Sequence, residues 1–233
     1  EMLSEDFIIA DEFTMADMRL SYELFKHIEK GVRVVIVGDV DQLPSVGPGN
    51  VFRELVLCGV IPVTILAMVF RQGKDSRIAA NAHKMQENDT NLDYGDDFIF
   101  CPADTAAEAA DKVAEYYRSF VDAYGVDNVQ VLTPFRKKGE ASVNALNDRL
   151  GEVVNPKSSI ARELKAGNAL YREGDRIIHN KNKNDISNGD IGYITDIYQD
   201  EDGVDLMRLS FSDGRIVEYS AEDADLIEHA YAT

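Results

Sequence analysis

The chain carries near its start the stretch Asp6-Phe7-Ile8-Ile9-Ala10-Asp11-Glu12, a short apolar run that ends in two acidic side chains. Its length and its branched residues favour a buried strand. A second apolar run covers residues 32–37 and is followed by Gly38-Asp39, and between the two runs apolar residues recur at helical spacing. Strand, helix and strand in this order form a βαβ unit, so the sequence predicts an α/β fold with a parallel sheet.

Polar side chains follow both predicted strands. Asp11 and Glu12 come directly after the first strand, and Asp39 and Gln42 follow the second. The carboxyl ends of parallel strands meet at one edge of the sheet, which is where ligands gather in such folds. We therefore expect a binding site at this edge, although a single acidic residue after a strand is also typical of a residue that only caps a helix.

Two longer patterns resemble a known family. Residues 37–49, VGDVDQLPSVGPG, resemble motif III of superfamily I helicases of the RecD-like group, which includes the exodeoxyribonuclease V alpha subunit. Residues 7–15, FIIADEFTM, resemble motif II of that group, with Phe13 and Thr14 where Ala and Ser are usual. Residues 69–82 resemble its motif IV. The resemblance runs in the family's order, from motif II to the start of motif V.

The resemblance implies a catalytic role for four residues. Asp11 would hold Mg²⁺ through water, and Glu12 would polarise the water that attacks the γ-phosphate of ATP. Gln42 would sense the γ-phosphate or orient that water, and Arg71 would reach it as an arginine finger. These four residues are the expected catalytic and nucleotide-binding side chains, with ATP as the substrate and Mg²⁺ as the cofactor.

The second half of the chain resembles the DNA-binding parts of the same family. Residues 131–137, VLTPFRK, followed by Leu146-Asn147, resemble the start of the second motor domain. Residues 171–176 and 188–192 resemble its SH3-like barrel, and Asn-Gly and Asp-Gly pairs predict hairpins there. The residues expected to contact single-stranded DNA are Thr133, Pro134, Arg136, Lys137, Asn147, Asn180 and Asn182. For the last two, a solvated hairpin loop is an equally good interpretation.

These patterns predict an α/β fold with partial RecA-like P-loop NTPase motor domains and parallel sheets, plus a small SH3-like antiparallel β-barrel insertion. We expect residues 1–95 in the first motor domain without its P-loop, 96–160 in the second, 161–228 in the barrel, and 229–233 back in the second domain, truncated at motif V. Helices are expected at residues 76–86, 105–124 and 139–150. Further strands are expected at residues 61–69, 98–101 and 129–132.

The charge is unevenly distributed. The 233 residues carry a formal net charge of −18, which argues at first against nucleic acid. Residues 126–190, however, hold 11 basic and 9 acidic residues, so the expected DNA contacts fall in a stretch with a net charge of +2. Two cysteines without metal-like spacing and the lack of a long apolar run predict a cytoplasmic protein without a membrane partner.

The resemblance implies an ATP-dependent DNA helicase that translocates on single-stranded DNA in the 5′→3′ direction and unwinds duplexes in recombination and repair. No P-loop sequence is present, so we expect the chain alone to lack ATPase activity. The expected partners are single-stranded DNA, duplex junctions and subunits of an exonuclease complex. Two alternatives stay open, namely the helicase segment of a conjugative relaxase and a non-catalytic DNA- or protein-binding module.

Overall fold

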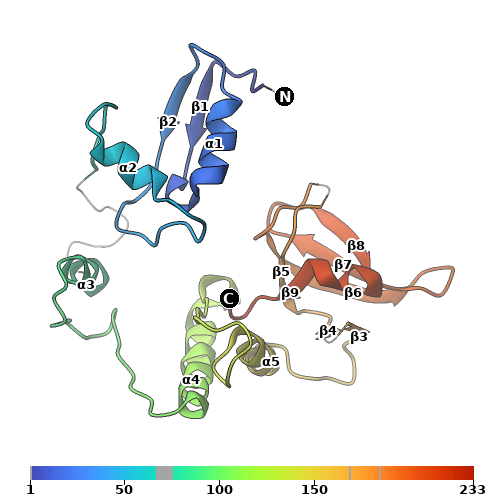
Figure 1. The fold of residues 1–233 in the computed structure, drawn as a ribbon. Coiled ribbons are helices and arrows are strands. Elements are labelled where there is room, and N and C mark those ends of the chain that lie inside the picture. The colour runs from blue at the N-terminus through green and yellow to red at the C-terminus, as the bar shows by residue number, and fades with distance from the viewer. Residues whose placement is uncertain (1, 67–75, 168, 184) are drawn as a thin grey trace. The chain divides into compact units, whose positions relative to one another are not determined.

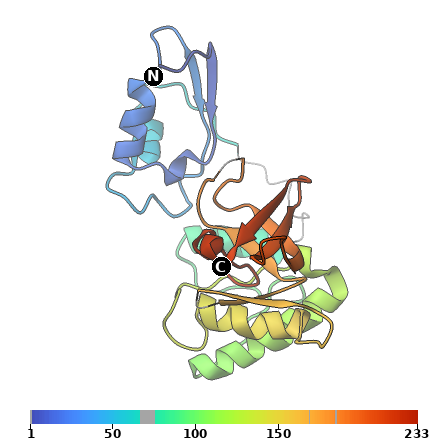
Figure 2. The same cartoon turned by 90° about the vertical axis from the view of Figure 1, so that its right-hand side faces the viewer.

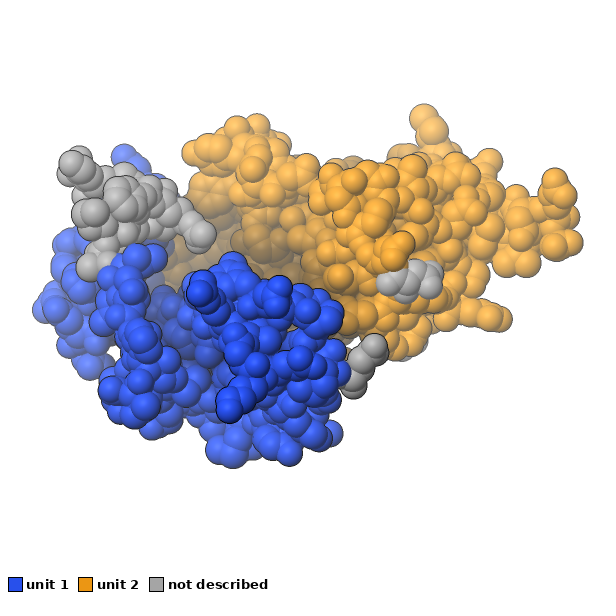
Figure 3. All heavy atoms as spheres, turned by 90° about the horizontal axis from the view of Figure 1, so that it is seen from above, with its two compact units in different colours: residues 1–100 blue, residues 101–233 orange. Residues whose placement is uncertain are grey.

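The chain folds into two compact units, residues 1–100 and 101–233, which are coloured separately in Figure 3. The structure, a computed structural model, describes residues 2–66, 76–167, 169–183 and 185–233. Arg71, the expected arginine finger, lies outside the described residues. Within the described ranges, no helix has the length and the apolar character that a membrane span requires.

The first unit contains the predicted βαβ unit. Its elements are β1 (Phe7–Ala10), η1 (Phe13–Met15), α1 (Met18–Lys26), β2 (Arg33–Ile36), α2 (Val51–Leu57) and α3 (Arg77–Gln86). β1 and β2 pair in parallel, with Phe7 beside Arg33 and Ala10 beside Ile36 (Figure 1). The Asp17 carboxylate accepts a hydrogen bond of 2.8 Å from the Leu20 N–H and so begins α1. The parallel sheet predicted from the two apolar runs is therefore confirmed.

The two faces of the β1–β2 sheet differ. Ala10 and Ile36 pack against a small core of buried residues that includes Phe13 and Phe52. On the other face Phe7 and Ile9 are 51% and 62% exposed. Strands of a parallel sheet are normally covered on both faces, so within the described part of the chain this sheet is covered on one face only.

Three predicted strands do not form as expected. No strand is present at residues 61–66, and residues 67–69 lie outside the described ranges. Residues 98–101 make only an isolated bridge between Gly95 and Phe98, and residues 129–132 only one between Val131 and Ala232. An apolar run is not sufficient for a strand, because a strand also needs a neighbour that continues the hydrogen bonding.

The second unit begins with two helices, α4 (Ala106–Tyr124) and α5 (Val143–Val154), joined through the short turn η2 (Val126–Asn128). The Thr105 hydroxyl accepts a hydrogen bond of 3.1 Å from the Glu108 N–H and begins α4. The two helices pack side by side (Figure 2), around a core that includes Tyr117, Leu146 and Leu150. Tyr231 and Ala232, near the end of the chain, lie in the same core.

The remaining strands form a sheet and a hairpin. They are β3 (Glu163–Ala166), β4 (Ala169–Arg172), β5 (Arg176–His179), β6 (Ile191–Gln199), β7 (Asp205–Phe211), β8 (Ile216–Ser220) and β9 (Ile227–His229), with η3 (Ala221–Leu226) before β9. The sheet is antiparallel with the order β8-β7-β6-β5-β9, and β3 and β4 form a separate hairpin. This SH3-like architecture agrees with the prediction, but backbone hydrogen bonds among the described residues do not close the sheet into a barrel.

One apolar core nevertheless joins the sheet and the hairpin. Leu164 of β3 and Tyr171 of β4 belong to the same buried cluster as Ile177, Met207 and Leu209 of the sheet. The SH3-like part is therefore a single packed body in which the hairpin covers the sheet. We predicted no strands at β3 and β4, because their short runs carry charged residues and show no clear alternation of apolar side chains.

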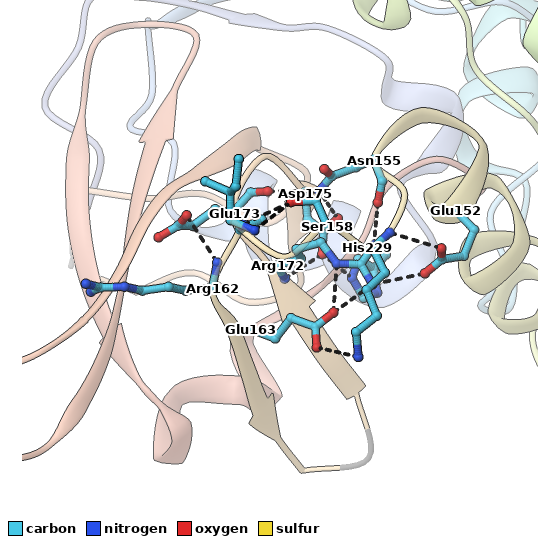
Figure 4. Close-up of polar contacts among 12 residues, drawn as sticks. Glu152, Asn155, Ser158, Arg162, Glu163, Arg172, Glu173, Asp175 and His229 are labelled. Atoms are coloured by element: carbon cyan, nitrogen blue, oxygen red, sulfur yellow. Dashed lines mark hydrogen bonds and ion pairs between the residues drawn. The ribbon is translucent and has the colours of Figure 1, made fainter.

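A buried carboxylate connects this body to α5. Asp175 is 4% exposed and accepts hydrogen bonds from the Asn155 side chain (2.8 Å), the Tyr231 hydroxyl (3.0 Å) and the Arg172 N–H (2.7 Å). His229 Nε2 lies 3.1 Å from the same carboxylate (Figure 4). Burial by itself raises the pKa of Asp175, but the hydrogen bond and electrostatic attraction of His229, together with the hydrogen bonds from Asn155 and the Arg172 N–H, outweigh it and hold the pKa below its ordinary value.

Arg172 makes a second connection at the same junction. Its guanidinium, with a side chain only 8% exposed, bonds Glu152 of α5 at 3.0 Å and Glu163 of β3 at 2.9 Å (Figure 4). A buried arginine is expensive to desolvate unless carboxylates and carbonyls take up its donors, as they do here. The orientation of the SH3-like part on α5 is therefore set by polar contacts as well as by packing.

Replacing Asp175 tests this junction. We expect Asp175→Ala to lower the free energy of unfolding by about 3 kcal/mol, because the buried donors around it lose their acceptor. Asp202→Ala, in an exposed hairpin turn, should change it by less than about 0.5 kcal/mol. Urea denaturation followed by circular dichroism measures both, and similar effects of the two substitutions would contradict the role of Asp175.

The effect of Asp175→Ala on the free energy of unfolding should depend on pH. The pKa of Asp175 is depressed in the folded state, so its charged form stabilises the fold at pH values above the ordinary pKa of 3.8. That stabilisation is lost as the pH falls through the depressed value. The difference in stability between the wild-type protein and Asp175→Ala should therefore narrow below about pH 4.

Candidate functional site

The two strand ends meet at one edge of the first unit. Asp11 and Glu12 follow β1, and the chain after β2 is held beside them by a hydrogen bond of 2.9 Å from the Phe13 N–H to the Val37 carbonyl. Asp39 follows two residues later, and the side chains of Asp11, Glu12 and Asp39 are all exposed. The edge predicted to carry the site therefore does gather solvent-accessible carboxylates.

Glu12 has an unusual backbone conformation. Its φ of 51° and ψ of 36° lie in the left-handed region, which costs a residue other than glycine roughly 1 kcal/mol. The Glu12 N–H donates a hydrogen bond of 2.9 Å to the Asp11 carboxylate, which compensates part of that cost. Backbone strain of this kind clusters at functional sites, so the turn after β1 supports the choice of Asp11 and Glu12 as site residues.

A threonine joins the two strand ends. The Asp39 N–H donates to the Thr14 hydroxyl at 3.0 Å, and this hydroxyl donates to the Asp39 carbonyl at 3.2 Å. Thr14 is 4% exposed, so both bonds are shielded from water. A Cβ at Gly38 would come within 2.7 Å of this hydroxyl and 3.0 Å of the Phe52 ring, so only glycine allows this close approach.

Thr14 is a residue of the candidate site that the sequence analysis did not single out. There it was noted only as a departure from the serine that is usual in motif II. Serine and threonine share the hydroxyl that makes these two bonds, so the substitution preserves the connection between the strand ends. The signal that could have identified the residue is a hydroxyl side chain two positions after the expected catalytic glutamate.

Gln42 lies on the loop that starts at Asp39. Its backbone N–H donates to the Asp39 carbonyl at 3.2 Å, and its side-chain amide lies 3.5 Å from the Asp39 carboxylate. The loop is braced further on, where the Met18 N–H donates to the Pro48 carbonyl at 3.0 Å. The exposed amide of Gln42 is therefore connected through Asp39 and Thr14 to the turn that carries Glu12.

The carboxylates at this edge fit one mode of Mg²⁺ binding. Among the described residues, no three side chains of His, Cys, Asp or Glu gather closely enough to hold a metal by themselves. Mg²⁺ commonly keeps several waters and is bound by one or two carboxylates together with substrate phosphates. Exposed Asp11 suits that mode, as an outer ligand that acts through water.

The expected DNA-binding residues after α4 divide into two groups. Asn147 is 5% exposed, and its amide donates to the Ala232 carbonyl at 2.9 Å and accepts from the Ala232 N–H at 2.8 Å. Its side chain is therefore occupied in the protein interior and is not available to DNA in this structure. The Thr133 hydroxyl donates to the Ala141 carbonyl at 2.6 Å and holds the following loop.

The remainder of this loop is exposed. Pro134, Arg136 and Lys137 are accessible to solvent, and Arg136 forms an ion pair with Glu228 of β9. Phe135 lies between them with 56% of its surface exposed, and the sequence analysis did not single it out. An exposed aromatic ring beside cations is the combination on which single-stranded bases stack.

The loop between β5 and β6 is also tied to acidic side chains. Lys181 pairs with Asp225, and Lys183 Nζ lies 2.7 Å from the Asp223 carboxylate, a bond that raises the pKa of Lys183 and lowers that of Asp223. The Asn182 side chain accepts a hydrogen bond of 2.7 Å from the Asn188 N–H and braces the loop. The Asn180 N–H donates to the Leu226 carbonyl at 2.7 Å.

Comparisons with known proteins match both units. A family model described as an AAA domain matches residues 1–98, and a model of the SH3 domain of ATP-dependent RecD-like DNA helicases matches residues 146–211. The chain is 31% identical over 229 residues to the ATP-dependent RecD2 DNA helicase of Deinococcus radiodurans. That alignment covers 97% of this chain and 30% of the relative.

The fold also resembles a solved helicase. The crystal structure of the Pif1 helicase from Candida albicans aligns with a TM-score of 0.54 at 17% identity, over 98% of this chain and 62% of that one. At this identity the likeness concerns the fold alone. The chain spans about a third of the length of this curated relative. By these matches the chain is similar over nearly its whole length to RecD-like DNA helicases.

Proposed function

We propose that this chain is part of an ATP-dependent DNA helicase that uses ATP hydrolysis to move along single-stranded DNA. The observation that carries the proposal is the edge at the ends of β1 and β2, where Asp11, Glu12 and Gln42 are held together through Thr14. The similarity to a RecD2 helicase over 97% of the chain supports the same function.

In this proposal each side chain at the edge has one task. Mg²⁺, when bound with ATP, neutralises charge on the phosphates. Asp11 orients the waters around that ion, and Glu12 accepts a proton from the water that attacks the γ-phosphate. The neutral amide of Gln42 contacts the γ-phosphate or that water without adding negative charge. Arg71, which lies outside the described residues, would neutralise the negative charge that spreads over the transferred phosphoryl group.

The proposal also explains why Thr14 is buried. The hydroxyl links the Gln42 loop to the Glu12 turn, so a shift of Gln42 towards a γ-phosphate, or away from it, is transmitted to Glu12. Such a link would couple recognition of ATP to activation of water. Thr14 is in this view a positioning residue rather than a catalytic one.

The DNA contacts belong to the second unit. Lys137 and Arg136 would bind backbone phosphates, and Phe135 between them would stack on a base. Neither kind of contact reads sequence, which suits an enzyme that must pass over any DNA. The family resemblance supports further parts of the proposal, namely duplex junctions, the 5′→3′ direction, a role in recombination and repair, and subunits of an exonuclease complex. A cytoplasmic location is also proposed, from the cysteine usage and the lack of a long apolar run in the sequence.

Removing the charge of Glu12 tests the proposed chemistry. In the full-length helicase, we expect Glu12→Gln to lower kcat for ATP hydrolysis by at least about 100-fold, because no general base remains. Binding of ATP should change by less than about threefold. Glu29→Gln, an exposed glutamate outside the site, is the matched control and should leave both quantities unchanged. Near-normal hydrolysis by Glu12→Gln would refute its assigned role.

Removing the hydroxyl of Thr14 tests the proposed coupling. We expect Thr14→Val to lower kcat about tenfold with little change in KM for ATP, because Gln42 and Glu12 lose their connection. Thr14→Ser keeps the hydroxyl and should restore most of kcat. Steady-state kinetics of both variants decide the point, since equal losses in the two variants would indicate a packing role for the threonine methyl group instead.

A further inference from the structure

Three cations near the proposed DNA surface already have acidic partners, and all three partners come from one short stretch. This acidic segment comprises residues 222–228, which span most of η3 and the start of β9. The three ion pairs are Arg136 with Glu228, Lys181 with Asp225, and Lys183 with Asp223. The two loops that carry the cations are far apart in sequence, and the acidic segment is what they have in common.

Two of the three ion pairs are largely exposed, whereas the pair of Lys183 with Asp223, at 41% and 27% exposed, is partly buried. The side chains of Lys181 and Asp225 are 54% and 66% exposed, and those of Arg136 and Glu228 are 62% and 40% exposed. Ion pairs in such surroundings contribute little to folding stability, because water solvates the separated charges almost as well. The three ion pairs on one short segment therefore call for an explanation other than stability.

The backbone of the acidic segment is held by buried neighbours. Leu226 and Ile227 are 9% and 1% exposed, and the Ile227 carbonyl accepts a hydrogen bond of 3.0 Å from the buried Tyr171 hydroxyl. Asp223 also caps η3, since its carboxylate accepts from the Ser220 N–H at 3.1 Å. The carboxylates are thus held in place over the cationic loops by buried neighbours.

We propose that the acidic segment is a built-in competitor of DNA, whose carboxylates occupy the places that backbone phosphates of single-stranded DNA take on Arg136, Lys181 and Lys183. This inference rests on the proposed function and extends it to a surface shared by two loops. A phosphate and a carboxylate present similar anionic oxygens to an ammonium or guanidinium group, so either can satisfy the same donors. Binding of DNA then exchanges one anion for the other.

The exchange has a measurable signature in the dependence on salt. A free lysine that neutralises a phosphate releases a condensed counterion, which contributes about 0.7 to the slope of log K against log salt for a single strand. A lysine that must first leave a carboxylate exposes that carboxylate, which takes up a cation and offsets the release. Paired cations should therefore add affinity and salt dependence only after their partners are neutralised.

The test is carried out in the full-length helicase with a fluorescent oligothymidylate, by anisotropy at several KCl concentrations. The test variant is Asp223→Asn, Asp225→Asn and Glu228→Gln together. The matched control removes the same number of charges from the β6–β7 hairpin, as Glu201→Gln, Asp202→Asn and Asp205→Asn, residues that form no ion pair within the described part of the chain. Both variants change the net charge equally, so a difference in DNA affinity between them shows the effect of the three ion pairs.

We expect the test variant to bind about tenfold more tightly than the wild type at 100 mM KCl, with a salt slope steeper by about 2, the sum of three phosphate contacts. The control should gain less than about threefold and keep the wild-type slope. Equal gains in both variants would mean that only overall charge matters and would overturn the inference. So would a test variant that binds like the wild type.

Two further measurements keep the result interpretable. Because Asp223 caps η3, melting temperatures are compared, and the variant Asp225→Asn with Glu228→Gln, which leaves the cap intact, should still gain about fivefold. If the wild type and every variant fail to bind DNA at any salt concentration, the proposed function itself is wrong. If the wild type binds but neither acidic-segment variant gains over the control, only the present inference is wrong.

Discussion

The pair of hydrogen bonds between Thr14 and Asp39 is the constraint on which the first unit depends. A parallel sheet brings two strand ends to one edge, but it does not by itself decide how the loops that follow them are arranged. The buried Thr14 hydroxyl fixes the position of the second loop, because it is hydrogen-bonded to both the N–H and the carbonyl of Asp39. Gly38 leaves the space for it, and the loop with Gln42 follows. The positions of the two loops at the site therefore depend on the hydrogen bonds of one side chain, that of Thr14.

In the second unit, carboxylates serve two opposite purposes. Asp175 is buried, fully hydrogen-bonded and holds the SH3-like part on α5 (Figure 4). Asp223, Asp225 and Glu228 are more exposed than Asp175, and each forms an ion pair with a cation. Such ion pairs contribute little to folding stability. The net charge of −18 thus gives a poor guide to DNA binding. In the proposed function, DNA binding depends on which cations are paired and on whether a phosphate can replace the partner.

The sequence predicted the parts of the fold that depend on local pattern. The parallel pairing of β1 and β2, the helix that begins at Thr105 and the hairpins at the two Asp-Gly turns all follow from periodicity and turn chemistry. The Asn188-Gly189 pair lies instead in the long connection between β5 and β6. The strands predicted at residues 98–101 and 129–132 do not form, because a strand needs a neighbouring strand and the local sequence pattern does not show whether one is present. The open sheet, in place of a closed barrel, is a matter of hydrogen bonding between distant strands.

The candidate site shows the same division. Asp11, Glu12 and Gln42 were predicted from motifs, and their connection through Thr14 was not, since a hydrogen bond between residues 14 and 39 has no local signature. Asn147 was predicted to contact DNA, but its buried amide bonds Ala232 instead. Motifs indicate which residue types are present, whereas burial and partners decide what each can do.

The central claim is that ATP is hydrolysed at the edge formed by the ends of β1 and β2. The most direct measurement is a structure of the full-length helicase bound to Mg²⁺ and a non-hydrolysable ATP analogue. The account predicts that one water in line with the γ-phosphate lies within hydrogen-bonding distance of both Glu12 and Gln42, with Asp11 reaching the metal through water. A γ-phosphate bound away from this edge, or a water that contacts neither side chain, would contradict it.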